Sequence, residues 1–197
     1  MPLLAICLGM ISAQTPVLPS AQAKALEFVR QAGGVIAWVK EDDHQVLCID
    51  YSLQGVTLDL APLEALTPLY ALRIMGPTVP ASEFRHLRKL PDLGLLVVTH
   101  SGVTDDGMRE IGYLVHLDKL DVRGDKLSAK GLTYLSRLRR LKRLFLYGSK
   151  LKDADIKPLE SLTWLDQLEL PPTVSLPAVA ALKKKLAHTL VERWSGN

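Results

Sequence analysis

The chain has 197 residues, of which 48% are hydrophobic and 23% charged, and its formal net charge is +3. This much apolar surface can offset the entropy of ordering the chain, so the composition excludes intrinsic disorder and fits one domain or a short array of repeats. The net charge is weaker than that expected of an obligate nucleic-acid-binding protein, but it leaves a local basic patch open.

The first 23 residues carry no charged side chain, contain an apolar run from Leu3 to Ile11 and end in an Ala-Gln-Ala sequence at Ala23. This pattern predicts a signal peptide cleaved after Ala23, although the usual basic residue before the apolar run is missing. We therefore expect export to the periplasm, the cell surface or the medium, or a cytoplasmic protein if residues 1–23 are not a signal peptide. The run is shorter than the ~20 apolar residues that span a bilayer, so no membrane span is expected.

Residues 24–45 are predicted to form an N-terminal cap made of a helix and the first strand of a hairpin. Residues 21–31 have the pattern of a helix, which Gly33 and Gly34 would end. Two apolar runs at residues 35–39 and 46–51 flank a polar turn and predict a β-hairpin.

Between residues 46 and 175 the apolar residues recur in fixed columns. One column holds Cys48, Leu72, Leu96, Leu120, Leu144 and Leu168, each 24 positions after the previous one. Units in this region contain the sequence L-x-x-L-x-L, whose alternation predicts a β-strand, and then apolar residues spaced three apart, which predict a short α- or 3₁₀-helix. Such a unit cannot bury its own apolar edge, so we expect the units to stack into a solenoid.

The units resemble those of bacterial leucine-rich-repeat proteins that read L-x-L-x-G-T-x-[VI]-T-D-x-G-L. Residues 98–108 match this sequence well and residues 124–132 nearly match it. The resemblance implies an α/β fold, a short right-handed horseshoe with a parallel β-sheet on its concave side and short helices on its convex side. Thr104 with Asp105, and also Ser128, stand where helix N-caps are expected.

Residues 176–197 are predicted to be a C-terminal cap. An amphipathic helix over residues 177–194 would cover the exposed edge of the last repeat, with Lys183, Lys184 and Lys185 on its polar side. A helix that lies on a membrane surface is the alternative interpretation.

The sequence offers no motif that indicates catalysis. It contains no HExxH, paired CxxC or G-x-S-x-G sequence, and its five histidines stand at unrelated positions in the repeats. We therefore expect neither an enzyme nor a cofactor or metal site.

The concave strands provide the candidate binding surface. Side chains that alternate with the core leucines are expected to point outward, changing from apolar in the first units to basic and aromatic in the middle ones. The residues predicted to bind a partner are Arg73, Lys119, Asp121, Arg123, Arg143, Phe145 and Tyr147. Aromatic residues beside arginine are enriched in protein interfaces, so we expect a monomeric, non-catalytic module that binds a protein or peptide, and an acidic partner would suit its charge.

The alternative partner is an anionic polymer, either nucleic acid or an acidic polysaccharide. Its site would be the basic patch around residues 119–143, to which Arg139, Arg140 and Lys142 contribute. This basicity is confined to one unit and is not required by the fold. The small net charge of the chain argues against nucleic acid.

Overall fold

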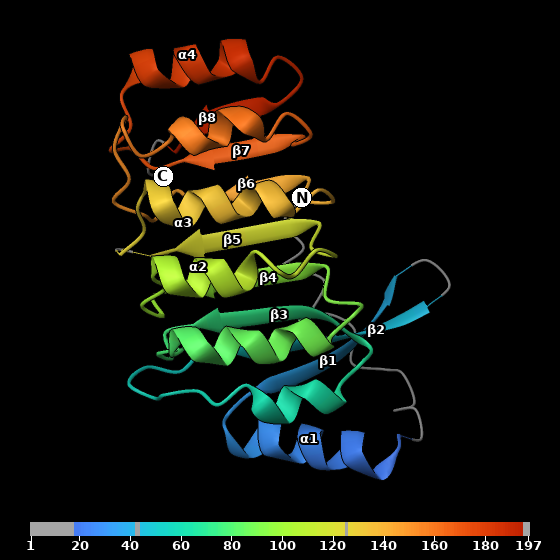
Figure 1. The fold of residues 1–197 in the computed structure, drawn as a ribbon. Helices are drawn as coiled ribbons and strands as arrows, with labels where there is room; N and C mark the ends of the chain where they lie inside the picture. Colours follow the sequence, from blue (N-terminus) through green and yellow to red (C-terminus); the bar gives the residue numbers. More distant parts are fainter. Residues whose placement is uncertain (1–17, 42–43, 125, 195–197) are drawn as a thin grey trace.

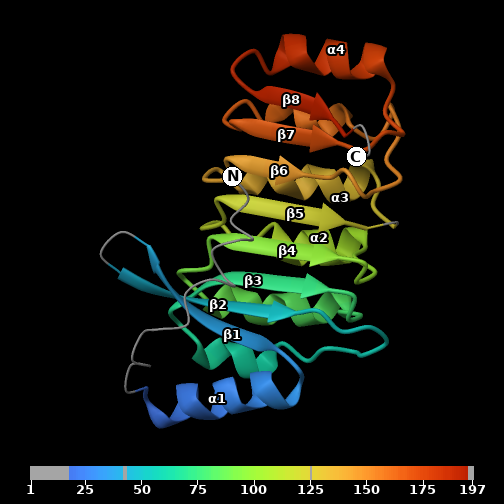
Figure 2. The same cartoon turned by 180° about the vertical axis from the view of Figure 1, so that it is seen from behind.

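The computed structural model describes residues 18–41, 44–124 and 126–194. Within them, eight strands form one sheet in the order of the sequence, and helical segments cover one side of it. The helices face the viewer in Figure 1 and the strands do so in Figure 2. Most of the predicted signal peptide, and Asp42 and Asp43 of the predicted hairpin turn, lie outside the described residues.

The N-terminal cap contains the helix and the hairpin that the sequence predicts. Helix α1 (Ser20–Gln31) packs Ala25, Leu26 and Val29 into the core, and the chain then turns at Gly33 with a positive φ. Strands β1 (Val35–Glu41) and β2 (His44–Tyr51) pair antiparallel. Strand β2 pairs parallel to the next strand, so the hairpin joins the cap to the repeats.

Each repeat contributes one strand followed by one or two helical segments, and β2 is the strand of the first repeat. The next strands are β3 (Leu69–Met75), β4 (Leu95–Thr99), β5 (Lys119–Arg123), β6 (Arg143–Phe145) and β7 (Gln167–Leu170). The helical segments are η2 (Ala61–Ala65), η3 (Ala81–Lys89), α2 (Asp105–Ile111), α3 (Ala129–Thr133), η4 (Tyr134–Arg137) and η5 (Lys157–Ser161). Most are 3₁₀ segments or single turns, because a repeat this short leaves no room for a longer helix on the side of the solenoid that the helical segments cover.

The core lies between the sheet and the helical segments and runs the length of the solenoid. The column residues Leu72, Leu96, Leu120, Leu144 and Leu168 are paired in register on neighbouring strands, and each is fully buried. Burial of a leucine side chain contributes about 1.5 to 3 kcal/mol, so the repeated columns are the main source of stability.

Hydrogen bonds from an aspartate of one repeat to the helix N-cap of the next tie neighbouring repeats together. Thr104 caps α2, as predicted, by accepting a bond from the amide of Gly107. Asp105 reaches the next repeat, where its carboxylate accepts bonds from the amide (2.9 Å) and the hydroxyl (2.5 Å) of Ser128. Asp153 makes the same pair of bonds to Ser175, at 2.7 and 2.6 Å.

The C-terminal cap corrects the prediction of one helix over residues 177–194. Helix α4 (Leu176–Lys185) ends early, and the chain then forms an eighth strand, β8 (Leu190–Arg193), parallel to β7. Val191 pairs with Leu168 and is buried, so the segment acts as a further repeat. The helix prediction was wrong because pairing with β8 satisfies the backbone edge of β7, which a helix would have left open.

None of the helices in the described part of the chain is long and apolar enough to cross a membrane.

Candidate functional site

The register of the strands arranges the outward side chains of the sheet in three rows. We call the sheet face turned away from the helical segments the concave face (Figure 2). The first row is Ala71, Leu95, Lys119, Arg143, Gln167 and Leu190. The second row is Arg73, Val97, Asp121, Phe145, Glu169 and Glu192. Arg123 lies in the third row, and Tyr147 and Trp194 follow just beyond β6 and β8.

Asp121 and Arg123 position Tyr147. Asp121 is only 8% exposed, and its carboxylate accepts a bond from the Tyr147 hydroxyl at 3.3 Å and one from Arg123 Nε at 3.4 Å. The guanidinium of Arg123 lies 4.0 Å from the centre of the Tyr147 ring. Burial raises the pKa of Asp121, and the charge of Arg123 opposes this shift. Arg123 is therefore neutralised within the protein, and both groups support the aromatic ring.

Lys119 and Arg143 form a pair of cations next to Phe145. They are in register on β5 and β6, and the Lys119 ammonium lies 4.8 Å from the centre of the Phe145 ring. Burial first, and the charge of Arg143 second, lower the pKa of Lys119. No carboxylate in the described ranges forms an ion pair with either cation. These two cations can therefore meet a partner's negative group.

Three aromatic rings continue from this point across the sheet. Phe145 and Tyr147 meet edge to face, with 6.4 Å between the ring centres and 86° between the planes. The ring of Trp194 lies 5.6 Å from that of Tyr147, and Trp194 is 42% exposed. Trp194 is a candidate site residue that the sequence did not predict, because residues up to 194 were assigned to a helix. The column shift at Val174 and Val179, one position early, was the signal that could have located β8.

Two carboxylates lie in the second row beyond Phe145. Glu169 is paired with Phe145 on one side and with Glu192 on the other. Gln167 donates a hydrogen bond to Glu169 at 3.1 Å. Burial is the main cause that raises the pKa of Glu169, and the charges of Glu192 and Asp121 add to it. The concave face is thus acidic beside its basic and aromatic centre.

Arg73 does not join this group. It forms an ion pair with Asp50 at 3.4 Å, and strand β4 separates it from Asp121. Of the predicted site residues, the structure therefore brings together Lys119, Asp121, Arg123, Arg143, Phe145 and Tyr147.

The other basic residues around position 140 lie at the amino ends of the strands and are partly neutralised. Arg140 pairs with Asp118 and Lys142 with Asp166, both at 3.8 Å. Arg139 lies over the ring of Trp164 at 4.1 Å. Each of these three side chains therefore already has a partner within the protein.

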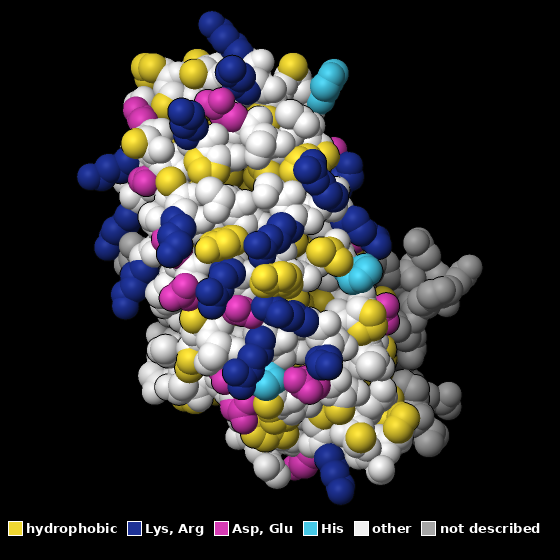
Figure 3. All heavy atoms as spheres, in the orientation of Figure 1, with side chains coloured by type: hydrophobic (Ala, Val, Ile, Leu, Met, Phe, Trp, Pro, Cys, Tyr) yellow, Lys and Arg dark blue, Asp and Glu magenta, His cyan; other side chains and the backbone are white. Residues whose placement is uncertain are grey.

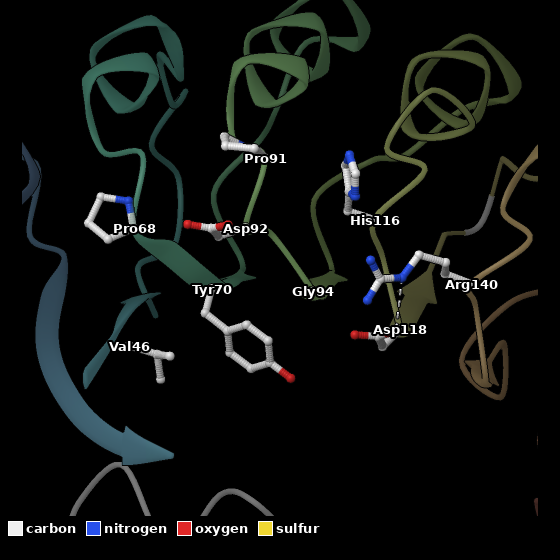
Figure 4. A pocket seen from close by; sticks show the side chains of 9 residues that line it. All are labelled: Val46, Pro68, Tyr70, Pro91, Asp92, Gly94, His116, Asp118 and Arg140. Atoms are coloured by element: carbon white, nitrogen blue, oxygen red, sulfur yellow. Dashed lines mark ion pairs between the residues drawn. The ribbon is translucent and has the colours of Figure 1, made fainter. Parts of the chain in front are cut away.

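A groove of about 360 Å³ opens at the same ends of the strands. Figure 4 shows its lining residues, which are Val46, Pro68, Tyr70, Pro91, Asp92, Gly94, His116, Asp118 and Arg140. The ion pair of Arg140 with Asp118 occupies one side of it. Within the described ranges, no group of three or more His, Cys, Asp or Glu residues could hold a metal ion.

Comparisons with known proteins identify the fold. No protein-family model matches the chain, and no curated protein matches it. Among solved structures it is similar to an internalin (inlF) of Listeria monocytogenes, with a TM-score of 0.57 and 21% identity over 73% of this chain and 39% of that one. It is also similar to a leucine-rich-repeat protein of Leptospira interrogans, with a TM-score of 0.51 and 22% identity over 70% of this chain and 34% of that one.

The chain thus spans well under half the length of these two proteins. Their likeness concerns the fold, and it agrees with the parallel sheet, the register of its leucines and the short helical segments on its other side. The chain is therefore a leucine-rich-repeat solenoid of the kind found in bacterial proteins.

Proposed function

We propose that this protein is a non-catalytic recognition module that binds a protein or peptide on its concave face. The observation that carries the proposal is the connected group of Phe145, Tyr147 and Trp194, three partly exposed rings on an open sheet. Aromatic side chains dominate the binding energy of protein interfaces because they bury a large area.

The ring of Tyr147 is also held in place before any partner binds. Asp121 bonds to the hydroxyl of Tyr147, and Arg123 covers its ring. A side chain that is already ordered loses less conformational entropy on binding, about 0.5 to 1.5 kcal/mol less for each such side chain. This support favours a surface selected for binding over an incidental one.

An anionic polymer is the weaker candidate. Glu169 and Glu192 would repel it from the concave face, and Arg140 and Lys142 are already paired with carboxylates. A polymer held by several of these cations would also dissociate steeply as the salt concentration rises.

Affinity capture with the full chain, followed by mass spectrometry of the bound proteins, identifies the partner. We expect Phe145→Ala and Tyr147→Ala each to weaken its binding at least tenfold, since ring truncation at an interface centre typically costs about 2 kcal/mol or more. Tyr113→Ala is the matched control, because this exposed ring follows α2 and lies outside the three rows. Equal binding of the wild type and both concave variants would refute the proposal.

We further propose that the protein is exported, on the basis of its first 23 residues. Cleavage after Ala23 would cut within α1 and remove its first turn, with the hydrogen bond of Gln22 to Thr67. The buried residues of α1, which are Ala25, Leu26 and Val29, all follow the cleavage site, so processing would keep these three side chains. Sequencing the N-terminus of the protein from its native cells tests this. A mature chain that begins at Lys24 is expected, and a chain that retains residues 1–23 would contradict it.

A further inference from the structure

Two carboxylates on the concave face lie opposite each other on neighbouring strands. Glu169 and Glu192 are direct neighbours in the register of β7 and β8. No Lys, Arg or His in the described part of the chain forms an ion pair with either carboxylate. Like charges directly opposite on neighbouring strands are destabilising. The fold therefore keeps an arrangement that a bound cation would relieve.

Aromatic rings lie next to Glu169 and Glu192. Phe145 is the neighbour of Glu169 on β6, and Trp194 lies two positions beyond Glu192, against the ring of Tyr147. A cation is attracted to the face of an aromatic ring, and most strongly to tryptophan. The carboxylates and the rings together suit an ammonium or guanidinium group carried on an apolar stem, because its stem can pack on the rings while its charge meets Glu169 and Glu192.

Positive side chains also lie on the concave face, close to the two glutamates. Lys119 and Arg143 are neighbours in the first row, and neither has an ion-pair partner among the described residues. From the strand spacing and the rise per residue, the Cα of Arg143 lies about 8 Å from that of Glu169, and the Cα of Lys119 lies about 16 Å from that of Glu192. An extended peptide covers this range in about three to five residues.

We propose that the concave face binds an extended peptide segment with opposite charges at its two ends. An acidic residue of the segment contacts Lys119 and Arg143. A lysine or arginine about three to five positions away lies between Glu169 and Glu192 against Trp194, in accordance with the strand spacing. This inference rests on the proposed function and specifies its partner, which carries both charges and is not simply acidic.

The test selects random 12-residue peptides displayed on phage with the full-length protein. We expect the enriched sequences to pair an acidic residue with Lys or Arg at this separation. For the best synthetic peptide, Glu169→Gln with Glu192→Gln should weaken binding about tenfold, as expected when a desolvated charge pair is lost. Glu160→Gln, which removes an exposed carboxylate on η5, is the matched control and should leave the affinity unchanged.

A charge exchange adds a second measurement. Glu192→Lys should reject the selected peptide and regain binding to the same peptide with its basic residue changed to Glu. Thermal unfolding of each variant shows that it is folded, and removal of one of two opposed carboxylates is expected not to lower the unfolding temperature.

The possible results separate the two proposals. If Phe145→Ala and Tyr147→Ala select and bind peptides as the wild type does, the concave face is not the binding surface and the proposed function fails. If these variants lose binding but the selected peptides show no preference for Lys or Arg, or the double glutamine variant binds them normally, the proposed function holds and the charge-paired peptide is wrong.

Discussion

The bridge from Asp105 to the next repeat provides a sharp test of how the solenoid is held together. Asp105→Ala removes two hydrogen bonds to Ser128 and leaves the Ser128 amide without its acceptor. Bonds to a charged group contribute about 1.5 to 3 kcal/mol, so we expect the free energy of unfolding to fall by about 2 to 3 kcal/mol. For a chain of this size, each kcal/mol lowers the unfolding temperature by about 2 to 4 °C.

The neighbouring residue Asp106 is the matched control. It is exposed in the first turn of the same helix, so Asp106→Ala removes the same charge from the helix N-terminus without removing the bridge. We expect it to change the free energy of unfolding by less than about 0.5 kcal/mol. Urea unfolding followed by far-ultraviolet circular dichroism measures both variants. Equal losses of stability in the two variants would refute the role of the bridge.

A substitution at Gly131 provides a second test of the bridge from Asp105 to Ser128. A Cβ at this position would collide with the Asp105 carboxylate, so Gly131→Ala should displace the bridge and destabilise the protein. When Asp105 is already alanine, the collision with the carboxylate is gone and only a tight approach of 3.3 Å to the Cα of residue 105 remains. The higher helix propensity of alanine, about 1 kcal/mol, should then offset most of the cost of Gly131→Ala. The double-mutant cycle is therefore expected to show strong coupling between the two sites. Additive effects of Asp105→Ala and Gly131→Ala would mean that the carboxylate and the glycine do not share the space.

Three further predictions concern stability. Hydrogen bonds from Ser175 lower the pKa of Asp153, so this carboxylate stabilises the fold above its ordinary pKa, and that contribution disappears as the pH falls through the lowered value. Asp153→Asn should therefore make the urea midpoint less dependent on pH between about 5 and 2. Burial and Glu192 raise the pKa of Glu169, so its ionisation opposes folding, and Glu169→Gln should stabilise the protein at pH 7 but not at pH 3; a loss of stability at pH 7 would contradict this. Leu144→Ala in the fully buried column should lower the free energy of unfolding by about 2 to 5 kcal/mol, measured by urea unfolding, and a smaller loss would show that the core collapses around the cavity.

The central repeats could be predicted because their columns leave few alternatives. Leucines that recur at one interval can all be buried only if the units stack with their strands in register, and Leu96, Leu120 and Leu144 do so. The N-caps at Thr104 and Ser128 could be predicted for a similar reason, because this motif is local.

The last unit could not be predicted in the same way. Its columns are shifted by one position, and residues such as Leu182 and Leu186 fit a helix as well as a repeat. The choice between them depends on the open edge of β7, which belongs to another part of the chain. The same error concealed two residues of the candidate site, Glu192 and Trp194.

The sequence alone determined the solenoid, its concave sheet and most of the residues on that sheet, because a periodic apolar pattern has one efficient way to be buried. Only the tertiary structure decided which of these residues are available to a partner. Asp121 and Tyr147 are 26 positions apart yet share a hydrogen bond, whereas the neighbouring Lys119 and Arg143 form no ion pair with any described residue. Charge pairing depends on distances between atoms of different repeats, and those distances exist only once the repeats have stacked.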